Sequence, residues 1–168
     1  MTGRVSVGMA RLAVCKAGEA EVLATHALGS CVGLTLYDPV AKVGGLLHFM
    51  LPAPARGEQL KEGNHMYGAV SIPIMFKQAY ALGAQKSRLI VCGAGAAEMI
   101  KGRGDAVRIG QRNRTMLRKI LWKNGIRLSG EAMGGDKPRT MFMELATGKV
   151  VIAQGGAESV LWSNSRAA

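Results

Sequence analysis

Cys31 and His48 are the residues of this sequence whose types and spacing could carry out chemistry together. Cys31 ends the turn-forming stretch Gly29-Ser30-Cys31, and His48 lies seventeen residues further on. A neighbouring imidazole can take the proton of a thiol and leave a strongly nucleophilic thiolate. The pair therefore suggests a nucleophile and its general base. The alternative is a small buried cysteine and an ordinary core histidine.

The elements that must position this pair are two apolar runs that a β-hairpin would bring together. The runs 31–37 and 43–50 flank Asp38-Pro39, which is typical of a turn. A four-residue loop that begins at Asp38 would place Cys31 directly opposite His48. Directly opposed Cβ atoms lie about 4.5–5.5 Å apart, close enough for an imidazole to reach a thiol. A slip of one residue would put the two side chains on opposite faces.

The residues around the pair strengthen the hypothesis and supply alternatives to it. Gly29 allows a substrate to approach closely, and the turn at Ser30 exposes backbone N–H groups that could hold an oxyanion. His26 is a rival base, but in an alternating strand it points away from the face that carries Thr25. His65 follows a long polar loop and is expected at the surface.

The composition indicates a soluble globular protein. The chain has 168 residues, of which 48% are hydrophobic and 20% charged, so we expect one domain over residues 1–168. No apolar run approaches the ~18 residues that a membrane span needs, and no secretory signal is visible, so we expect a cytoplasmic monomer. Cys15, Cys31 and Cys92 lack CxxC spacing, which argues against disulfides and a zinc site. We therefore expect free thiols, Cys15 and Cys92 buried, and no metal or cofactor.

Positive charge is concentrated in the segment 101–127. The net charge is +11, and this segment has one acidic residue, Asp105. Such a patch is either a solvated helix face or a surface for an anionic partner, such as nucleic acid, a membrane surface or an acidic protein. Few aromatic residues are available for base stacking, so we expect neither nucleic-acid binding nor membrane insertion. The basic residues are Lys101, Arg103, Arg108, Arg112, Arg114, Arg118, Lys119, Lys123 and Arg127.

Strand patterns outnumber helix patterns, which favours an α+β class with two main helices rather than a regular βαβ repeat. Helical periodicity predicts helices over 65–82 and 109–124, ended by Gly83 and Gly125. Pro73 is expected to kink or break the first helix. Besides the hairpin, strands are predicted at 5–14 (two short strands or one bulged strand), 21–25, 87–92, 126–133, 139–145 and 149–153.

Longer motifs resemble those of one family, the CheD proteins of bacterial chemotaxis, which are chemoreceptor glutamine deamidases. The resemblance runs in order along nearly the whole chain. It departs from the family pattern at 91–96, where a lysine is missing and the glycines are spaced differently. The matching stretches are Leu28-Gly29-Ser30-Cys31-Val32, Tyr37-Asp38-Pro39, Gly44-Gly45, His48-Phe49-Met50-Leu51-Pro52, Ile109-Gly110-Gln111-Arg112-Asn113, Gly134-Gly135-Asp136 with Arg139, and Thr147-Gly148.

The resemblance implies a fold, a reaction and partners. The fold would be a layered α/β/β sandwich, and the catalytic trio would be Cys31, His48 and Thr25, with Thr25 orienting the imidazole. The reaction would convert glutamine to glutamate through a thioester and release ammonia. Its substrates would be the cytoplasmic helices of chemoreceptors, long coiled coils rich in Glu and Gln. The phosphatase CheC would be a second partner.

The resemblance leaves some roles open. Its downstream motifs make Arg112, Asn113, Gly134, Gly135 and Asp136 candidate contacts for the substrate or a partner. The glycine pair is also explained by a turn that needs positive φ. The alternative to the enzyme is a non-catalytic adaptor that binds the receptor or CheC. An adaptor has no need of the complete trio, which favours the enzyme.

Overall fold

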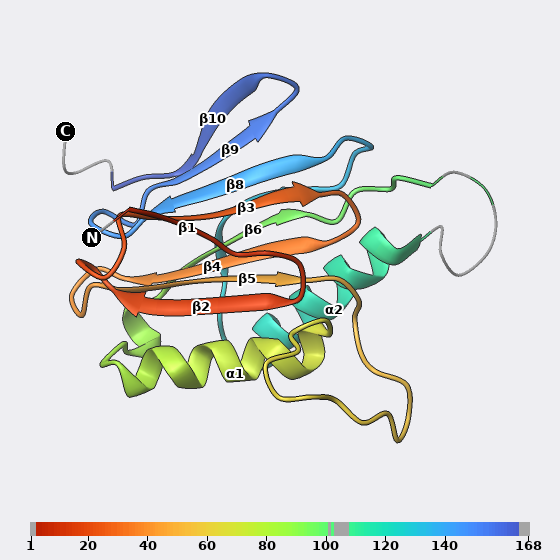
Figure 1. Ribbon diagram of the computed structural model, residues 1–168, viewed down its shortest axis with the longest axis horizontal. Helices are drawn as coiled ribbons and strands as arrows, with labels where there is room; N and C mark the ends of the chain where they lie inside the picture. Colours follow the sequence, from red (N-terminus) through yellow and green to blue (C-terminus); the bar gives the residue numbers. More distant parts are fainter. Residues whose placement is uncertain (1–2, 101, 103–107, 165–168) are drawn as a thin grey trace.

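The computed structural model describes residues 3–100, 102 and 108–164. In these residues ten strands form two five-stranded sheets, and two α-helices cover one of the sheets (Figure 1). The middle sheet has the order β2 (Arg11–Lys16), β5 (Val43–Phe49), β4 (Val32–Asp38), β6 (Ile90–Gly95) and β7 (Leu128–Met133). The outer sheet has the order β1 (Arg4–Ser6), β3 (Val22–Leu28), β8 (Arg139–Glu144), β9 (Val150–Gln154) and β10 (Ala157–Trp162). The helices are α1 (Gly68–Ala81) and α2 (Ile109–Lys123).

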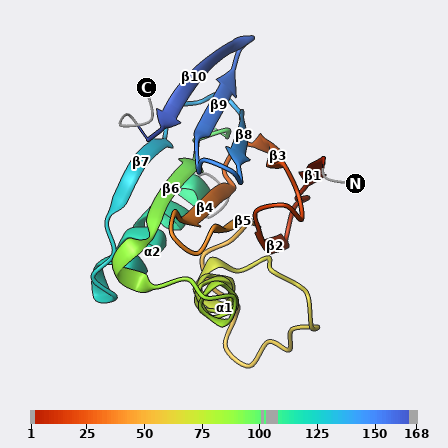
Figure 2. The same cartoon turned by 90° about the vertical axis from the view of Figure 1, so that its left-hand side faces the viewer.

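The elements stack in three layers, with the helices on the middle sheet and the middle sheet on the outer sheet (Figure 2). This confirms the predicted strand-rich α/β/β sandwich with two main helices. One apolar cluster fills the space between the helices and the middle sheet, and a second fills the space between the sheets. Every residue of β4 and β5 is buried, because the helices cover one face of these strands and the outer sheet covers the other.

β4 and β5 form the predicted hairpin, but their register differs from the prediction by two residues. Asp38 pairs with Val43, so Gly33 is the residue directly opposite His48. The expected direct pairing of Cys31 with His48 is therefore wrong. A shift of two residues preserves the face on which a side chain lies. Cys31 accordingly packs against the cluster between the two sheets, which is the side to which His48 also points.

Asp38 sets the register by organising the turn. Its Oδ1 accepts hydrogen bonds from the N–H groups of Val40 (2.8 Å) and Ala41 (3.0 Å), while its carbonyl accepts one from Lys42 (2.9 Å). The loop is therefore 39–42 rather than 38–41. Arg88 pairs with the buried carboxylate at 2.9 Å. Burial raises the pKa of Asp38, but the guanidinium and three backbone N–H groups outweigh burial and hold that pKa below its ordinary value.

α1 is one continuous helix through Pro73, so the predicted break is wrong. Pro73 is exposed, and the helix continues without the hydrogen bond that the missing N–H would donate. The helix ends as predicted at Gly83, whose φ is +104°. The N–H of Ala84 donates to the carbonyl of Ala79, which closes the last turn. Neither helix in the described part of the chain is long and apolar enough to cross a membrane.

The remaining strands agree with the predictions in place but not always in extent. The N-terminal stretch forms two short strands, and these belong to different sheets: β1 to the outer and β2 to the middle. β6 begins at Ile90 instead of Ser87, because Lys86–Arg88 forms a 3₁₀ turn. β10 was not predicted. Most of its residues are exposed, so it lacks the alternation of apolar and polar residues that marks a half-buried strand.

Candidate active site

Thr25 of β3 and His48 of β5 meet between the two sheets, and both are fully buried. Oγ1 of Thr25 lies 2.7 Å from Nδ1 of His48 and 2.6 Å from the carbonyl oxygen of Val7. A carbonyl only accepts, so the single proton of the hydroxyl goes to Val7. Nδ1 must then carry a proton and donate it to Thr25. The network therefore assigns the tautomer of His48, with the lone pair on Nε2.

Nε2 of His48 is buried and has no hydrogen-bond partner among the described residues. A buried acceptor without a partner costs on the order of 1–3 kcal/mol, so such an atom needs an explanation. Burial also lowers the pKa of His48 to about 4, which keeps the imidazole neutral at physiological pH. A neutral imidazole with a free Nε2 is the form that a general base requires.

Cys31 is half-buried at the bend that precedes β4. Burial raises the pKa of its thiol, while its own backbone N–H lowers that pKa by a smaller amount. The resting pair is therefore a neutral thiol and a neutral imidazole. No hydrogen bond joins the thiol of Cys31 to Nε2 of His48 in this structure, since that nitrogen has no partner. Catalytic hydrogen bonds are often loose without substrate and tighten in the complex.

The loop 29–31, called the nucleophile loop because it carries the candidate nucleophile Cys31, is held by all three of its carbonyls. These accept hydrogen bonds, in chain order, from the N–H of Ala97 (2.9 Å), from Nδ2 of Asn113 (2.9 Å) and from the N–H of Ala96 (2.8 Å). The N–H groups of the last two loop residues donate to no backbone carbonyl in the described part of the chain. The carbonyl groups of the loop are thus fixed, and its two N–H groups outside the backbone network are donors that could bind an oxyanion.

Asn113 connects the two halves of the site from α2. Besides the bond to Ser30, its Nδ2 donates to the carbonyl of Met50 (2.9 Å), directly after β5. Asn113 is fully buried, so this candidate for substrate contact lies inside the protein, whereas Arg112 is exposed. Gly110 permits the close approach of α2, because a Cβ there would lie 2.5 Å from the carbonyl oxygen of residue 97. Gly110 and Asn113 of the 109–113 motif therefore support the site from the side of the helix layer.

The segment that departs from the family pattern lies against the nucleophile loop. Gly95 has a φ of +106°, and a Cβ at this position would collide with the carbonyl oxygen of Cys31. The carbonyl of Gly95 accepts hydrogen bonds from the N–H of Gly134 (2.9 Å) and from Nη1 of Arg139 (3.1 Å). Gly134 and Gly135 both have positive φ, at 95° and 73°, and form the turn that donates to the carbonyl of Gly95.

Three alanines with left-handed backbone conformations surround the site. They are Ala10 (φ 58°), Ala27 (φ 57°) and Ala96 (φ 51°). The N–H of Ala10 donates to the carbonyl of His48 (2.9 Å), and that of Ala96 donates to the carbonyl of Cys31. Ala27 occupies the irregularity in β3 just before the nucleophile loop. Each such residue costs roughly 1–2 kcal/mol, and strain of this kind tends to cluster at functional sites.

The rival candidates lie elsewhere. His26 is exposed and packs edge-on against Phe142 on the outer face of the outer sheet. His65 is half-buried, with Nδ1 3.2 Å from the hydroxyl of Ser71. Cys92 is buried as expected, whereas Cys15 is only half-buried. Asp136 is exposed on the turn after the two glycines. Within residues 3–100, 102 and 108–164, no group of three or more His, Cys, Asp or Glu side chains could hold a metal ion.

A thiol, an imidazole with a free Nε2 and a third group on Nδ1 form the arrangement on which cysteine hydrolases are built. Residues 50–154 match the family described as CheD chemotactic sensory transduction. The chain belongs to the CheD family. The family match begins two residues after His48, so the roles of Thr25, Cys31 and His48 depend on the geometry described above.

Several relatives are similar over most of the chain. A protein of Solibacter usitatus, named a probable chemoreceptor glutamine deamidase CheD, is 44% identical over 156 residues, which are 89% of this chain and 90% of the relative. A protein of the same name from Pyrococcus abyssi is 43% identical over 152 residues, 89% of this chain and 91% of the relative. A protein of Syntrophus aciditrophicus, named a probable chemoreceptor glutamine deamidase CheD 1, is 43% identical over 137 residues, which are 81% of this chain and 85% of the relative.

Proposed function

We propose that this protein is a protein-glutamine glutaminase that converts glutamine side chains of chemoreceptors to glutamate. The observation that carries the proposal is the free, buried Nε2 of His48, whose tautomer is fixed through Thr25 and Val7. This supports a general base that serves the thiol of Cys31. The names of the relatives support the choice of substrate.

Acylation begins when the glutamine side chain enters beside the nucleophile loop. Nε2 of His48 takes the thiol proton while Sγ of Cys31 bonds to the amide carbon. The carbonyl oxygen gains the negative charge and is bound by the N–H groups of Ser30 and Cys31. Because both residues of the pair are neutral at rest, proton transfer accompanies the attack.

Collapse of the intermediate releases ammonia. The imidazolium of His48 gives its proton to the amide nitrogen, the C–N bond breaks, and a thioester to Cys31 remains. Nε2 then takes a proton from water, whose oxygen attacks the thioester carbon. The C–S bond breaks, the thiolate regains its proton from His48, and the carboxylic acid that forms releases its proton to solvent and becomes a carboxylate.

Thr25 acts as a positioning residue. Its hydroxyl oxygen accepts a hydrogen bond from Nδ1–H of His48 at every stage, so the ring cannot adopt the tautomer that would block Nε2. The Val7 carbonyl keeps the hydroxyl proton of Thr25 away from His48. These contacts also favour the imidazolium that forms during the reaction, which burial alone disfavours.

The cellular setting is part of the proposal. The protein would work in the cytoplasm as a monomer on the cytoplasmic helices of receptors, with the phosphatase CheC as a second partner. Membership of the CheD family supports this setting. A non-catalytic adaptor is the competing hypothesis. The buried, tautomer-fixed base favours the enzyme, because binding alone does not require a free Nε2.

Intact-mass spectrometry of a chemoreceptor cytoplasmic fragment tests the proposal. Each deamidation replaces NH₂ with OH and adds about one dalton, and the thiol of Cys31 is needed for every turnover. We expect the mass gain with the natural protein and none with Cys31→Ala. The same gain with both proteins would eliminate Cys31 as the nucleophile. No gain with either, accompanied by retained receptor binding, would favour the adaptor.

A further inference from the structure

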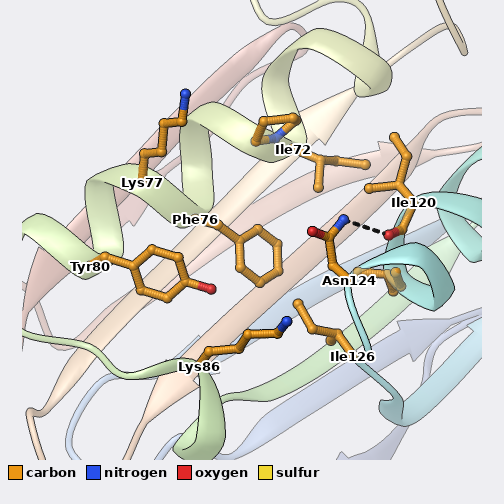
Figure 3. A pocket seen from close by; sticks show the side chains of 10 residues that line it. Ile72, Phe76, Lys77, Tyr80, Lys86, Ile120, Asn124 and Ile126 are labelled. Carbon is orange, nitrogen blue, oxygen red and sulfur yellow. Dashed lines mark hydrogen bonds between the residues drawn. The ribbon is translucent and has the colours of Figure 1, made fainter.

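A surface groove lies between α1 and α2, away from the residues of the candidate active site. It has a volume of about 300 Å³ and a mainly apolar floor (Figure 3). Phe76 lies at its centre, with Tyr80 on one side and Ile120 and Ile126 on the other. The full lining consists of Ile72, Pro73, Phe76, Lys77, Tyr80, Lys86, Ile120, Leu121, Asn124 and Ile126.

The groove is bordered by positive charge that no acidic side chain balances. Lys77 and Lys86 line it, and no acidic residue does. Lys123 follows Ile120 by three positions and so lies on the same side of α2. None of these three lysines forms an ion pair with another described residue. An apolar floor with free ammonium groups at its edge fits a partner with apolar and acidic side chains.

Two arginines of the predicted patch are placed differently. Arg114 and Arg118 pair with Glu131 at 3.2 and 2.9 Å, on the side of α2 that faces β7. Lys101, Arg103 and Asp105 lie outside the described residues. The lysines at the groove therefore differ from Arg114 and Arg118, whose guanidinium groups are engaged by a carboxylate.

The shape of the groove suits a helix. Its α1 border runs from Ile72 to Tyr80, which is about 12 Å or two helical turns. Two packed helices with an open seam accept the apolar ridge of a third helix. Ile120 lies seven positions after Asn113, the residue that holds the nucleophile loop, so the groove is about 10 Å further along α2. The groove lies in the helix layer, whereas Cys31 packs against the cluster between the sheets, so a substrate that engages both must extend around the edge of the middle sheet.

We propose that this groove docks an acidic amphipathic helix of the chemoreceptor while a target glutamine occupies the site at Cys31; this rests on the proposed function. Apolar side chains of the receptor helix pack on Phe76 and Ile120, and its carboxylates face Lys77 and Lys86. Contacts remote from the reacting amide hold the substrate in place and raise the effective concentration of its glutamine. The choice of which receptor glutamine is deamidated then depends on receptor residues that lie some distance from that glutamine.

Charge reversal at the groove tests this docking. Fluorescence anisotropy measures binding of a labelled receptor cytoplasmic fragment to proteins that carry Cys31→Ala, so that no turnover occurs. We expect Lys77→Glu with Lys86→Glu to raise Kd at least about tenfold, and Lys16→Glu with Lys149→Glu, an equal charge change elsewhere, to change Kd by less than about twofold. Equal Kd values for the two double variants would overturn the proposal.

Two further measurements separate docking from catalysis. Increasing salt should weaken binding of the natural groove more steeply than binding of Lys77→Gln with Lys86→Gln, because exposed charges are screened. With an active thiol, the ratio of kcat/KM for the receptor fragment to that for a short glutamine peptide should fall at least about tenfold in the charge-reversal variant. An unchanged ratio overturns docking but leaves deamidation intact. Failure to deamidate either substrate contradicts the proposed function, while the Kd comparison still decides docking.

Discussion

The hydroxyl of Thr25 and Nδ1 of His48 lie 2.7 Å apart and connect the outer sheet to the middle sheet. The direction of this hydrogen bond is set by a third group, the Val7 carbonyl, which takes the only proton that Thr25 can donate. The chemistry of the imidazole therefore depends on how the two sheets pack. A helix alone or a single hairpin could not fix the tautomer in this way.

Thr25→Val tests this relationship, because valine keeps the shape of threonine and removes the hydroxyl. We expect kcat to fall about 10- to 100-fold with little change in KM, the size of loss seen when a metal-binding histidine loses its hydrogen-bond partner. Thr25→Ser keeps an oxygen and serves as the control, with most of the activity retained. Steady-state kinetics on a glutamine peptide measure both variants. A valine variant as active as the natural protein would exclude the positioning role.

Asn113→Ala should loosen the link between the nucleophile loop and β5. It leaves the part-buried carbonyls of Ser30 and Met50 without a side-chain donor, and we expect a loss of about 2–3 kcal/mol in the free energy of unfolding. Thr115→Ala, at an exposed position of the same helix, should change it by less than about 0.5 kcal/mol. Urea unfolding compares the two. Equal stabilities would show that the Asn113 amide contributes nothing to the fold.

Gly95→Ala is expected to displace the nucleophile loop. The added Cβ meets the carbonyl of Cys31, and the positive φ adds strain of roughly 1 kcal/mol. Gly57→Ala is the matched control, since Gly57 also has positive φ (79°) but open space around its Cβ position. Both variants should lose some stability, and only Gly95→Ala should lose most of its activity. Full activity of a folded Gly95→Ala protein would contradict the close packing described.

Stability should fall as the solution becomes acidic, because His48 is buried in its neutral form. Its pKa is about 4 in the folded protein against an ordinary 6.5, so the unfolded chain binds the proton more readily. This difference stabilises the folded protein above pH 6.5, and the stabilisation is lost as the pH falls toward 4. We expect the free energy of unfolding to fall by about 2 kcal/mol between pH 7 and pH 5. Urea unfolding at the two pH values measures it. His48→Gln should reduce the difference, and an unchanged difference would refute the assignment to His48.

Alkylation of Cys31 by iodoacetamide reports the resting state of the pair. Burial raises the pKa of Cys31 and lowers that of His48, so the resting site holds few thiolates at neutral pH. The rate should rise steadily through the alkaline range. A plateau that begins near pH 5 would instead indicate a thiolate–imidazolium pair. Peptide mapping separates Cys31 from the half-buried Cys15.

The sequence made much of the site predictable because its chemistry depends on residue types. The sequence itself shows a cysteine in a glycine turn and a histidine on the facing apolar run. Two apolar runs around Asp38 predict the hairpin that connects them. The register could not be predicted, since it depends on hydrogen bonds that the N–H groups of the turn donate to the side chain of Asp38. The register error of two residues left Cys31 on the predicted face of the sheet, whereas an error of one residue would have placed it on the opposite face from His48.

Other parts of the site left little trace in the sequence. Val7 acts through its backbone carbonyl, and any residue has one. Asn113 did leave a trace: it shares the buried stripe of α2 with Leu117 and Leu121, so its spacing predicts a position inside the fold. β10 pairs only at the edge of the outer sheet, where exposed residues suffice and no pattern is required.

The mechanism rests on the claim that His48 is a neutral base with its proton on Nδ1. ¹⁵N NMR of the histidine side chains at pH 7 tests this directly. For His48 we predict a protonated Nδ1, coupled to its own hydrogen, and an Nε2 with the chemical shift of an unprotonated nitrogen. Thr25→Val should weaken this preference. A proton on Nε2, or on both nitrogens, would contradict the mechanism.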